Sequence, residues 1–241
     1  MSPAGRVVMV SSANRGIGRA IAATLHDAGY SLSLGAREPS SLDGVITDPG
    51  GERVLRARYD AQDPATHRDW VAATADRFGR IDALVNNAGT VTRVRVDDDP
   101  DDALGDAALE RMWAVNVKAP LSMTRRALPH LRRSGAGRVV NVCSIAGKAV
   151  YNDNVGYAMT KFAAVALSHA TRRAGWDDGV RCTALCPGFV ATDMTADVET
   201  FPHERMMAPD DVASLVLAVL GLSNNASVAE LVVNCRDDVT M

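Results

Sequence analysis

The 241-residue sequence has few cysteines and histidines, and their spacing does not fit the common metal or redox motifs. Its four cysteines form no Cys-x-x-Cys pair and no zinc-ligand pattern, so we expect Cys143, Cys182, Cys186 and Cys235 to be reduced core residues of a cytoplasmic protein. The five histidines are scattered, with no HxxxH or HExxH arrangement. The sequence therefore predicts no metal site.

Long apolar runs and a strong excess of charge are also missing. No uninterrupted apolar run approaches the ~18 residues needed to cross a bilayer, and the N-terminal MSPAGRVVMV lacks the apolar stretch and cleavage site of a signal peptide. The net charge is only −3, which offers no broad basic face to nucleic acid. We therefore expect a cytoplasmic protein with neither a membrane nor a nucleic-acid partner.

What the sequence does contain is a regular alternation of short apolar runs with amphipathic helical stretches, which is the βαβ pattern. Strands are predicted near 7–10, 30–34, 54–59, 81–86, 138–143, 180–185 and 231–234, and helices near 16–28, 65–78, 154–174 and 209–222, with a further long helix ending by residue 135. Right-handed crossovers would build one parallel sheet of about seven strands with helices on both faces. We predict an α/β, doubly wound, Rossmann-type fold in a single domain spanning residues 1–241.

Glycines mark the ends of three of these helices. Gly29, Gly79 and Gly135 each fall just past a helical pattern, where glycine most easily adopts a left-handed cap. The one charged run, Asp97 to Asp102, is interpreted as a solvated loop before the long helix.

A phosphate-binding turn is predicted directly after the first strand. The sequence from Ser11 to Gly18 reads SSANRGIG, and the helix begins at its glycines. Such a turn directs backbone N–H groups and the positive end of the helix at a pyrophosphate, while glycine lets the backbone approach closely. The candidate dinucleotide contacts in this turn are Ser12, Asn14, Arg15, Gly16, Ile17 and Gly18.

The end of the second strand indicates which dinucleotide binds. Folds that prefer NAD carry an acid about 20 residues beyond the glycines, for the ribose 2′-hydroxyl. Here the sequence reads Gly35-Ala36-Arg37. Without a carboxylate, and with Arg37 and Arg15 able to contact a 2′-phosphate, NADP(H) is favoured over NAD(H). The alternative is that both arginines are ordinary solvated charges.

A proton-transfer pair is predicted at the start of the helix near 154–174. Tyr157 and Lys161 are four residues apart and project from the same helix face. A nearby cation favours the phenolate and lowers a tyrosine pKa from about 10 toward the working pH, as proton transfer requires. Such pairs also occur on helix surfaces, but lysine fills only three of the 26 basic positions here, which favours a chemical requirement for Lys161.

Special residues also follow three successive strands. Asn86-Asn87-Ala88-Gly89 ends one strand, Ser144 closes the next, and Pro187-Gly188 follows a third. Ligands of open α/β sheets bind at the carboxyl ends of the strands, so we expect these residues to meet at one site. For Ser144, a capping or turn role is the alternative.

Taken in order, these motifs resemble the short-chain dehydrogenase/reductase family along nearly the whole chain. The resemblance rests on the SSANRGIG turn, Asp60 after the third strand, the Asn86 to Gly89 motif, Ser144 with the Tyr157 to Lys161 motif, and the Pro187 to Thr192 segment. It implies an NADP(H)-dependent oxidoreductase that interconverts a carbonyl and an alcohol.

The resemblance also implies a role for each residue. Tyr157 would be the general acid in reduction, Ser144 would hold the substrate oxygen, and Lys161 would bind the nicotinamide ribose while lowering the tyrosine pKa. Asn116 matches the asparagine that positions a water in the family's proton relay. The expected cofactor contacts outside the turn are Asp60 at the adenine, Thr192 at the carboxamide, and Asn87, Gly89, Pro187 and Val190.

Two features depart from the family pattern. Ser12 stands where the first glycine of the turn is usual, so the backbone must fit with a side chain present. The segment after the last strand, Leu231 to Asp238, lacks the Asp-Gly-Gly ending that many members carry. A homo-oligomer, either a tetramer or a dimer, is still expected from the resemblance.

The substrate is expected to be a small-molecule carbonyl or alcohol covered by a lid. The lid should span residues 189–208, which follow a strand end. Its apolar side chains suggest a mostly apolar carbonyl compound, unless they only pack the lid onto the sheet. They are Met194, Phe201, Met206 and Met207, with Val150 and Tyr151 as the opposite wall.

Two other functions remain open. A 3-oxoacyl-thioester reductase would need a basic surface for an acyl-carrier protein, which Arg93, Arg95, Arg125 and Arg126 could supply, although the acidic run lies beside them. The third hypothesis is a non-catalytic NADP(H)-binding regulator. Such a protein would have little reason to retain Ser144, Tyr157, Lys161 and Asn116 together.

Overall fold

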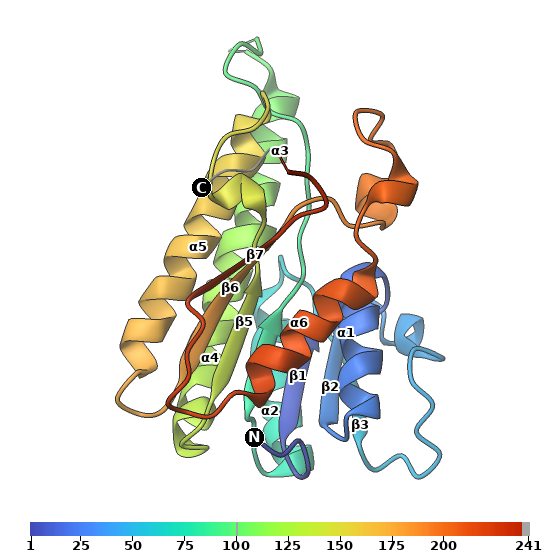
Figure 1. Ribbon diagram of the computed structural model, residues 1–241, viewed down its shortest axis with the longest axis vertical. Helices are drawn as coiled ribbons and strands as arrows, with labels where there is room; N and C mark the ends of the chain where they lie inside the picture. The colour runs from blue at the N-terminus through green and yellow to red at the C-terminus, as the bar shows by residue number, and fades with distance from the viewer. Residues whose placement is uncertain (100, 238–241) are drawn as a thin grey trace.

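The computed structural model describes residues 1–99 and 101–237, and within these residues seven parallel strands form one sheet (Figure 1). The strand order is β3-β2-β1-β4-β5-β6-β7. The strands are β1 (Val7–Ser11), β2 (Ser31–Ala36), β3 (Val54–Arg58), β4 (Ala83–Asn86), β5 (Arg138–Val142), β6 (Arg181–Pro187) and β7 (Glu230–Val233). The predicted doubly wound, parallel α/β fold is confirmed. Asp238, named above in the segment after the last strand, lies outside the described residues.

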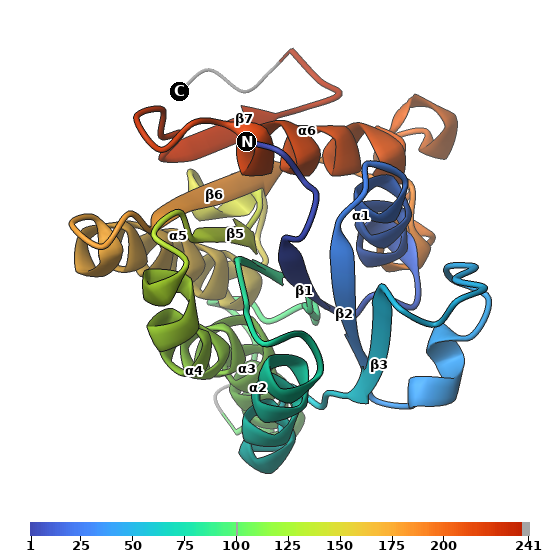
Figure 2. The same cartoon turned by 90° about the horizontal axis from the view of Figure 1, so that it is seen from below.

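Helices cover both faces of the sheet (Figure 2). One face carries α1 and α6, which pack against each other, and the other carries α2, α4 and α5. The helices are α1 (Gly16–Asp27), α2 (Pro64–Phe78), α3 (Ala103–Trp113), α4 (Ala119–Arg133), α5 (Val155–Gly175) and α6 (Pro209–Gly221). None of the helices in the described part of the chain has the length and apolar character to cross a bilayer.

The long helix predicted to end by residue 135 is not continuous. It consists of α3 and α4, joined without a loop by one π-helical turn, η2 (Ala114–Lys118). Its predicted end is confirmed, because Gly135 has φ +66° and lies just beyond Arg133. Gly29 and Gly79 also have positive φ, as expected for left-handed caps.

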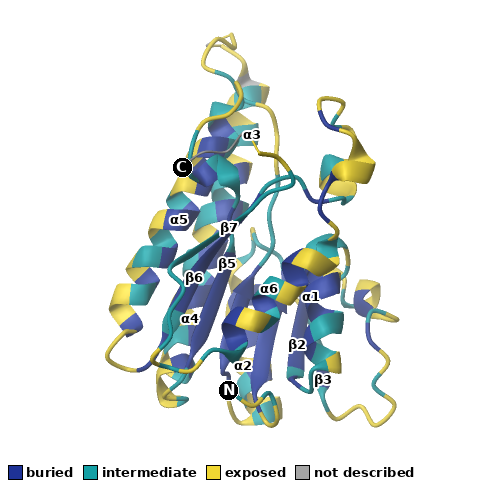
Figure 3. Ribbon diagram, in the orientation of Figure 1, coloured by how far each residue is buried: buried dark blue, intermediate teal, exposed yellow. Residues whose placement is uncertain are grey.

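Two apolar layers hold the helices to the sheet, and the inner strands β1, β2, β4, β5 and β6 are almost wholly buried, whereas the edge strands β3 and β7 are mostly half-buried (Figure 3). Ile21 and Val212 belong to the layer under α1 and α6, and Trp70 and Met123 to the layer under α2 and α4. All four cysteines are free thiols; Cys143, Cys182 and Cys186 are core residues as predicted, whereas Cys235 is only half-buried.

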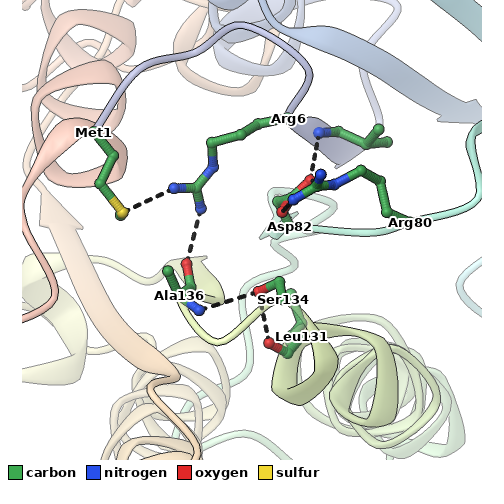
Figure 4. Close-up of polar contacts among 8 residues, drawn as sticks. Met1, Arg6, Arg80, Asp82, Leu131, Ser134 and Ala136 are labelled. Carbon is green, nitrogen blue, oxygen red and sulfur yellow. Dashed lines mark hydrogen bonds and ion pairs between the residues drawn. The ribbon is translucent and has the colours of Figure 1, made fainter.

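The amino-terminal end of the sheet is held by polar contacts that are buried or partly buried (Figure 4). Both carboxylate oxygens of Asp82 accept hydrogen bonds from Arg80, at 2.7 and 2.8 Å, and one of them also accepts the Val7 N–H. The Arg6 guanidinium donates to the Ala136 carbonyl at 2.8 Å. These contacts link β1, β4 and the turn before β5, so the predicted site motifs are left at the opposite, carboxyl edge.

Candidate active site

Four neighbouring strands, β1, β4, β5 and β6, each end in one of the predicted site motifs. From β1 the chain continues to β2 on one side, whereas β4 lies on the other side of β1, so the strand order reverses between β1 and β4. Ligands of open α/β sheets bind at this reversal point. The topology therefore assembles motifs that are far apart in the sequence along one edge.

The turn after β1 brings its backbone close to any ligand at this edge. Ser12 has φ +52°, the only positive φ of a non-glycine residue in the described ranges, and Gly16 has φ +50°. A Cβ on Gly18 would lie 2.1 Å from the Ser12 carbonyl oxygen, so no side chain fits at that position. Arg15 precedes α1 without a side-chain cap, and the turn therefore suits a pyrophosphate at the start of the helix.

Asn87 holds this turn from the end of β4. Its side-chain amide donates to the carbonyls of Ser11 and Ser12, at 3.0 and 3.2 Å. In return, the Ser11 hydroxyl oxygen accepts the N–H groups of Asn87 and Ala88, at 2.9 and 3.0 Å. Asn87 thus shapes the cradle, because its side-chain donors are both engaged with the turn itself.

Asn116 lies in the π-helical turn and is only 3% exposed. Its side-chain oxygen accepts the Thr90 N–H at 2.9 Å, and its amide donates to the Thr90 carbonyl at 2.9 Å and to the Thr160 hydroxyl at 3.0 Å. These bonds tie the helix to the segment after β4 and to α5. A π-turn inside an α-helix is often found at a functional site.

Tyr157 and Lys161 lie in the first two turns of α5, as predicted. The Lys161 ammonium is 5.5 Å from the centre of the Tyr157 ring and donates to the Val142 carbonyl at 3.1 Å. Lys161 is only 6% exposed, and no carboxylate pairs with it in the described part of the chain. An ammonium has three donors and is unfavourable when buried unpaired, so two Lys161 donors are available to a ligand.

Ser144 follows β5 and is half-buried. Its hydroxyl oxygen accepts the Ala146 N–H at 3.1 Å and caps a short 3₁₀ turn, η3 (Ile145–Gly147). The capping interpretation of Ser144 therefore holds in this structure. The cap also fixes the side chain at the carboxyl end of β5, and its hydroxyl proton can still be donated to a substrate oxygen.

The predicted nucleotide-reading residues lie at the ends of β2 and β3. Arg37 directly follows β2, is exposed, and forms no ion pair with any described residue. Arg15 instead pairs with Asp193 of the lid at 3.0 Å, with both side chains mostly exposed. Asp60 follows β3, and its carboxylate accepts the Gln62 N–H at 2.9 Å. Arg37 is therefore the better placed of the two arginines to contact a 2′-phosphate.

The expected lid, residues 189–208, folds back onto the sheet. Val190 and Met207 form an isolated parallel bridge, and the Ala191 N–H donates to the Met207 carbonyl at 2.9 Å. Thr192 lies beside the phosphate turn, because a Cβ on Gly16 would lie 3.3 Å from its methyl carbon. Pro187, the last residue of β6, leads into this segment.

The lid side chains correct one expectation. Met206 and Met207 are 8% and 9% exposed, so they pack the lid onto the core instead of lining a pocket. Only Met194 among the lid methionines is largely exposed. The inference of a mostly apolar substrate, which rested on these side chains, loses most of its support.

Sequence reasoning missed two residues that build the site. Thr160, fully buried, accepts from Asn116 and donates to the Tyr157 carbonyl at 2.8 Å. Asn154 caps α5 by accepting the Tyr157 N–H, and it also accepts the Val94 N–H. An asparagine directly before a helical pattern is a cap signal, so the role of Asn154 could have been predicted from the sequence. No sequence pattern predicts the contact between Thr160 and Asn116.

Comparison with known proteins agrees with this geometry. A family model described as short chain dehydrogenase matches residues 6–202. The chain belongs to the short-chain dehydrogenase/reductase family. Members of this family bind a nicotinamide cofactor, and the glycine turn, the Asn87 clamp and the buried Lys161 ammonium fit such a group.

Individual relatives extend the comparison. The chain is 43% identical over 232 residues to an agropine synthesis reductase of Rhizobium rhizogenes, covering 96% of this chain and 53% of that protein. It thus spans about half the length of that relative. It is 28% identical to an uncharacterized oxidoreductase of Staphylococcus saprophyticus, with 95% of each chain covered. The structure of an alcohol dehydrogenase from the archaeon Thermococcus sibiricus, complexed with 5-hydroxy-NADP, matches with a TM-score of 0.84, 28% identity and 95% coverage of both chains.

Proposed function

We propose that this chain is an NADP(H)-dependent oxidoreductase that reduces a ketone or aldehyde to an alcohol, or catalyses the reverse reaction. The observation that carries the proposal is Lys161, a nearly buried ammonium beside the Tyr157 ring with a single acceptor among the described residues. Such an arrangement is unfavourable unless a polar ligand supplies further acceptors. Ribose hydroxyls are suitable acceptors, and the phosphate turn lies along the same edge of the sheet.

Each predicted residue has a separate task in this proposal. The Tyr157 hydroxyl, which has no hydrogen-bond partner among the described residues, donates a proton to the substrate oxygen in reduction and accepts it in oxidation. Ser144 donates a hydrogen bond to the same oxygen. Lys161 holds the ribose, and Asn116, anchored by Thr90 and Thr160, fixes the helix that lies against α5. When bound, the nicotinamide supplies or accepts the hydride.

The preference for NADP(H) rests on the end of β2. The first residue after this strand is Arg37 instead of an acid, with Glu38 behind it, and the exposed Arg37 guanidinium can form charge-assisted hydrogen bonds to a 2′-phosphate. The Thermococcus structure, a neighbour with an NADP derivative bound, supports this choice. Asp193 neutralises Arg15 in this structure, so we assign the larger part of the discrimination to Arg37.

Arg37→Ala should test the cofactor assignment directly. We expect NADPH affinity to fall by about tenfold or more, because a charge-assisted bond contributes ~1.5–3 kcal/mol, while NADH affinity changes little. Arg15→Ala should give a smaller loss. Fluorescence titrations with both cofactors measure these changes, and equal losses for NADPH and NADH would contradict the role given to Arg37.

The 3-oxoacyl-thioester alternative receives less support. Arg93 and Arg95 both form ion pairs with Asp153, and Arg95 also pairs with Asp97, so these two members of the basic surface are neutralised within the chain. The expected homo-oligomer, a tetramer or a dimer, and the single domain remain predictions.

The reaction itself is tested by following NADPH and NADH consumption with purified protein. The panel should contain ketones, diketones, quinones and 3-oxoacyl thioesters. We expect turnover of one class with NADPH. Tight NADPH binding without turnover of any class would instead favour the regulator hypothesis.

A further inference from the structure

A cavity of about 540 Å³ lies outside the motifs described so far, between the lid and the segment that follows β7. Its lining residues are Phe201 and Arg205 from the lid and Cys235, Arg236 and Asp237 from the segment after β7. Figure 1 shows both segments beyond the carboxyl ends of β6 and β7. The cavity is therefore at the edge of the sheet at which the candidate active site lies.

The floor of the cavity is aromatic and firmly held. Phe201 is only 8% exposed, although its lid neighbours from 202 to 205 are all exposed. Its ring stacks on Phe189, with the centroids 5.8 Å apart and the planes at 16°. The Cys235 thiol donates to the Phe189 carbonyl at 3.6 Å, which joins the lid to the segment after β7. The two walls thus share one fixed apolar base.

Two guanidinium groups lie near this same ring. Arg205 is 5.4 Å and Arg236 is 5.9 Å from the Phe201 centroid. Among the described residues no carboxylate forms an ion pair with Arg205, although Asp237 contributes one negative charge to the lining. The lining therefore carries two positive charges and one negative charge, on an apolar floor.

We infer that this cavity is a subsite for a carboxylate group of the carbonyl substrate, with Arg205 as its principal ligand. A guanidinium presents paired donors that match a carboxylate, and a stacked phenyl ring suits the hydrocarbon part of such a molecule. The inference rests on the proposed function, since it narrows the proposed substrate class from any carbonyl compound to a keto acid. It also replaces the earlier expectation of a mostly apolar substrate, which lost its support because Met206 and Met207 are buried.

The cofactor phosphate does not account for this site. The 2′-phosphate is assigned to Arg37 at the end of β2, whereas the cavity involves the end of β7, and β1, β4, β5 and β6 lie between these two strands. We therefore assign this second anion-binding position on the same edge to the carbonyl substrate.

The test compares keto acids with their methyl esters, since the two share the same carbonyl group and differ in charge. Keto acids of increasing chain length should be assayed with NADPH. The substrate must be long enough for its carboxylate to bind in the cavity while its carbonyl group lies at Tyr157. For the best chain length we expect kcat/KM to favour the acid over the ester by about tenfold or more in the wild type. Arg205→Gln should bring this ratio close to one and leave the ester unaffected.

Matched variants make the result specific. Arg68→Gln, an exposed arginine of α2, should leave the acid-to-ester ratio unchanged, and Arg205→Lys should retain part of it. Equal kcat/KM for acid and ester in the wild type, or an equal loss of both in Arg205→Gln, would overturn the inference. A preference for a phosphonate analogue without a preference for the keto acid would overturn the carboxylate assignment.

Binding measurements separate this inference from the proposed function. If no carbonyl compound is turned over, the proposed function fails, but calorimetry can still measure keto-acid binding to wild type and to Arg205→Gln. Binding of the acid that is lost in Arg205→Gln supports the subsite even then. Absence of keto-acid binding to both proteins, in the presence of NADPH, contradicts it.

Discussion

At the scale of single residues, the candidate site depends on buried polar groups with few alternative partners. Asn116, Thr160 and the Tyr157 carbonyl form one continuous series of hydrogen bonds between the π-turn and α5. Removing one partner leaves a buried donor or acceptor unsatisfied, which costs about 1–3 kcal/mol. We therefore expect substitutions that keep the side-chain volume but remove a hydrogen-bonding atom to lower the stability of the protein.

Thr160→Val should reveal this sensitivity. Valine has the same shape but cannot accept the Asn116 amide, so we expect a loss of stability of about 1–3 kcal/mol and lower turnover. Thr160→Ser keeps the hydroxyl and should retain most of both properties. Urea denaturation and steady-state kinetics measure the two effects; a valine variant as stable and active as the serine variant would show that this hydrogen bond is unimportant.

Gly18→Ala should affect the phosphate turn through sterics alone. The new Cβ would lie 2.1 Å from the Ser12 carbonyl oxygen and 2.5 Å from the Asn87 amide nitrogen, so the turn must shift. We expect a destabilisation of about 1–3 kcal/mol together with weakened NADPH binding. Gly221→Ala, with no atom of the described residues within 4 Å of the new Cβ, is the matched control and should change stability by no more than about 0.5 kcal/mol. An unchanged turn variant would show that Gly18 is not sterically required.

The residue types at the site could be predicted from the sequence because each follows a strand or begins a helix. Tyr157, Lys161 and Ser144 are examples, since local pattern alone places them at the carboxyl edge. The partner of Arg15 could not be predicted, because Asp193 is 178 residues away and meets it only through the folding of the lid.

At the scale of secondary-structure elements, α2 holds the loop that carries Asp60. The His67 ring, only 1% exposed, contacts the Asp60 carbonyl at 2.9 Å and the Ser122 hydroxyl of α4 at 3.0 Å. Burial lowers the pKa of the His67 imidazole below its ordinary value, so the neutral ring is the native form. The position of the predicted adenine contact is thus linked to the protonation of a buried histidine.

Acidification should weaken this part of the fold. The unfolded chain keeps the ordinary histidine pKa of about 6.5 and binds the proton first, so stability must fall as the pH drops from about 7.5 to 5.5. The contribution of His67 is at most about 1.4 kcal/mol per pH unit. Urea denaturation at several pH values should show a steeper decline for wild type than for His67→Gln. Parallel declines would mean that folding does not lower the pKa of His67.

The order and type of the main elements could be predicted from hydrophobic periodicity, but not the π-turn between α3 and α4. A π-turn differs from an α-helix by one backbone register, and its stabilisation here comes from Thr90 and Thr160, which are remote in sequence. The burial of Met206 and Met207 could likewise not be predicted from the sequence, because flexible apolar side chains suit a pocket and a core equally well.

At the scale of the whole molecule, the sheet separates the two sources of specificity. The turn after β1, the end of β2 and the start of the lid form the side expected to bind the nucleotide, whereas the later part of the lid, with Phe201 and Arg205, and the segment after β7 form the side expected to bind the substrate. Tyr157 and Lys161, on α5, belong to neither periphery and would act where the two ligands meet. This division explains why the family could be predicted from the sequence whereas the substrate could not. The positions of the lid side chains, which would contact the substrate, depend on tertiary packing.

The account is tested most directly by comparing wild type with Tyr157→Phe in two assays, NADPH oxidation with a carbonyl substrate and fluorescence titration of NADPH. The substitution removes only the phenolic hydroxyl. We predict that turnover falls by about 10²–10⁴-fold while the NADPH dissociation constant stays within about threefold of wild type. Substantial turnover by Tyr157→Phe, with cofactor binding intact, would contradict the assignment of Tyr157 as the proton-transfer group.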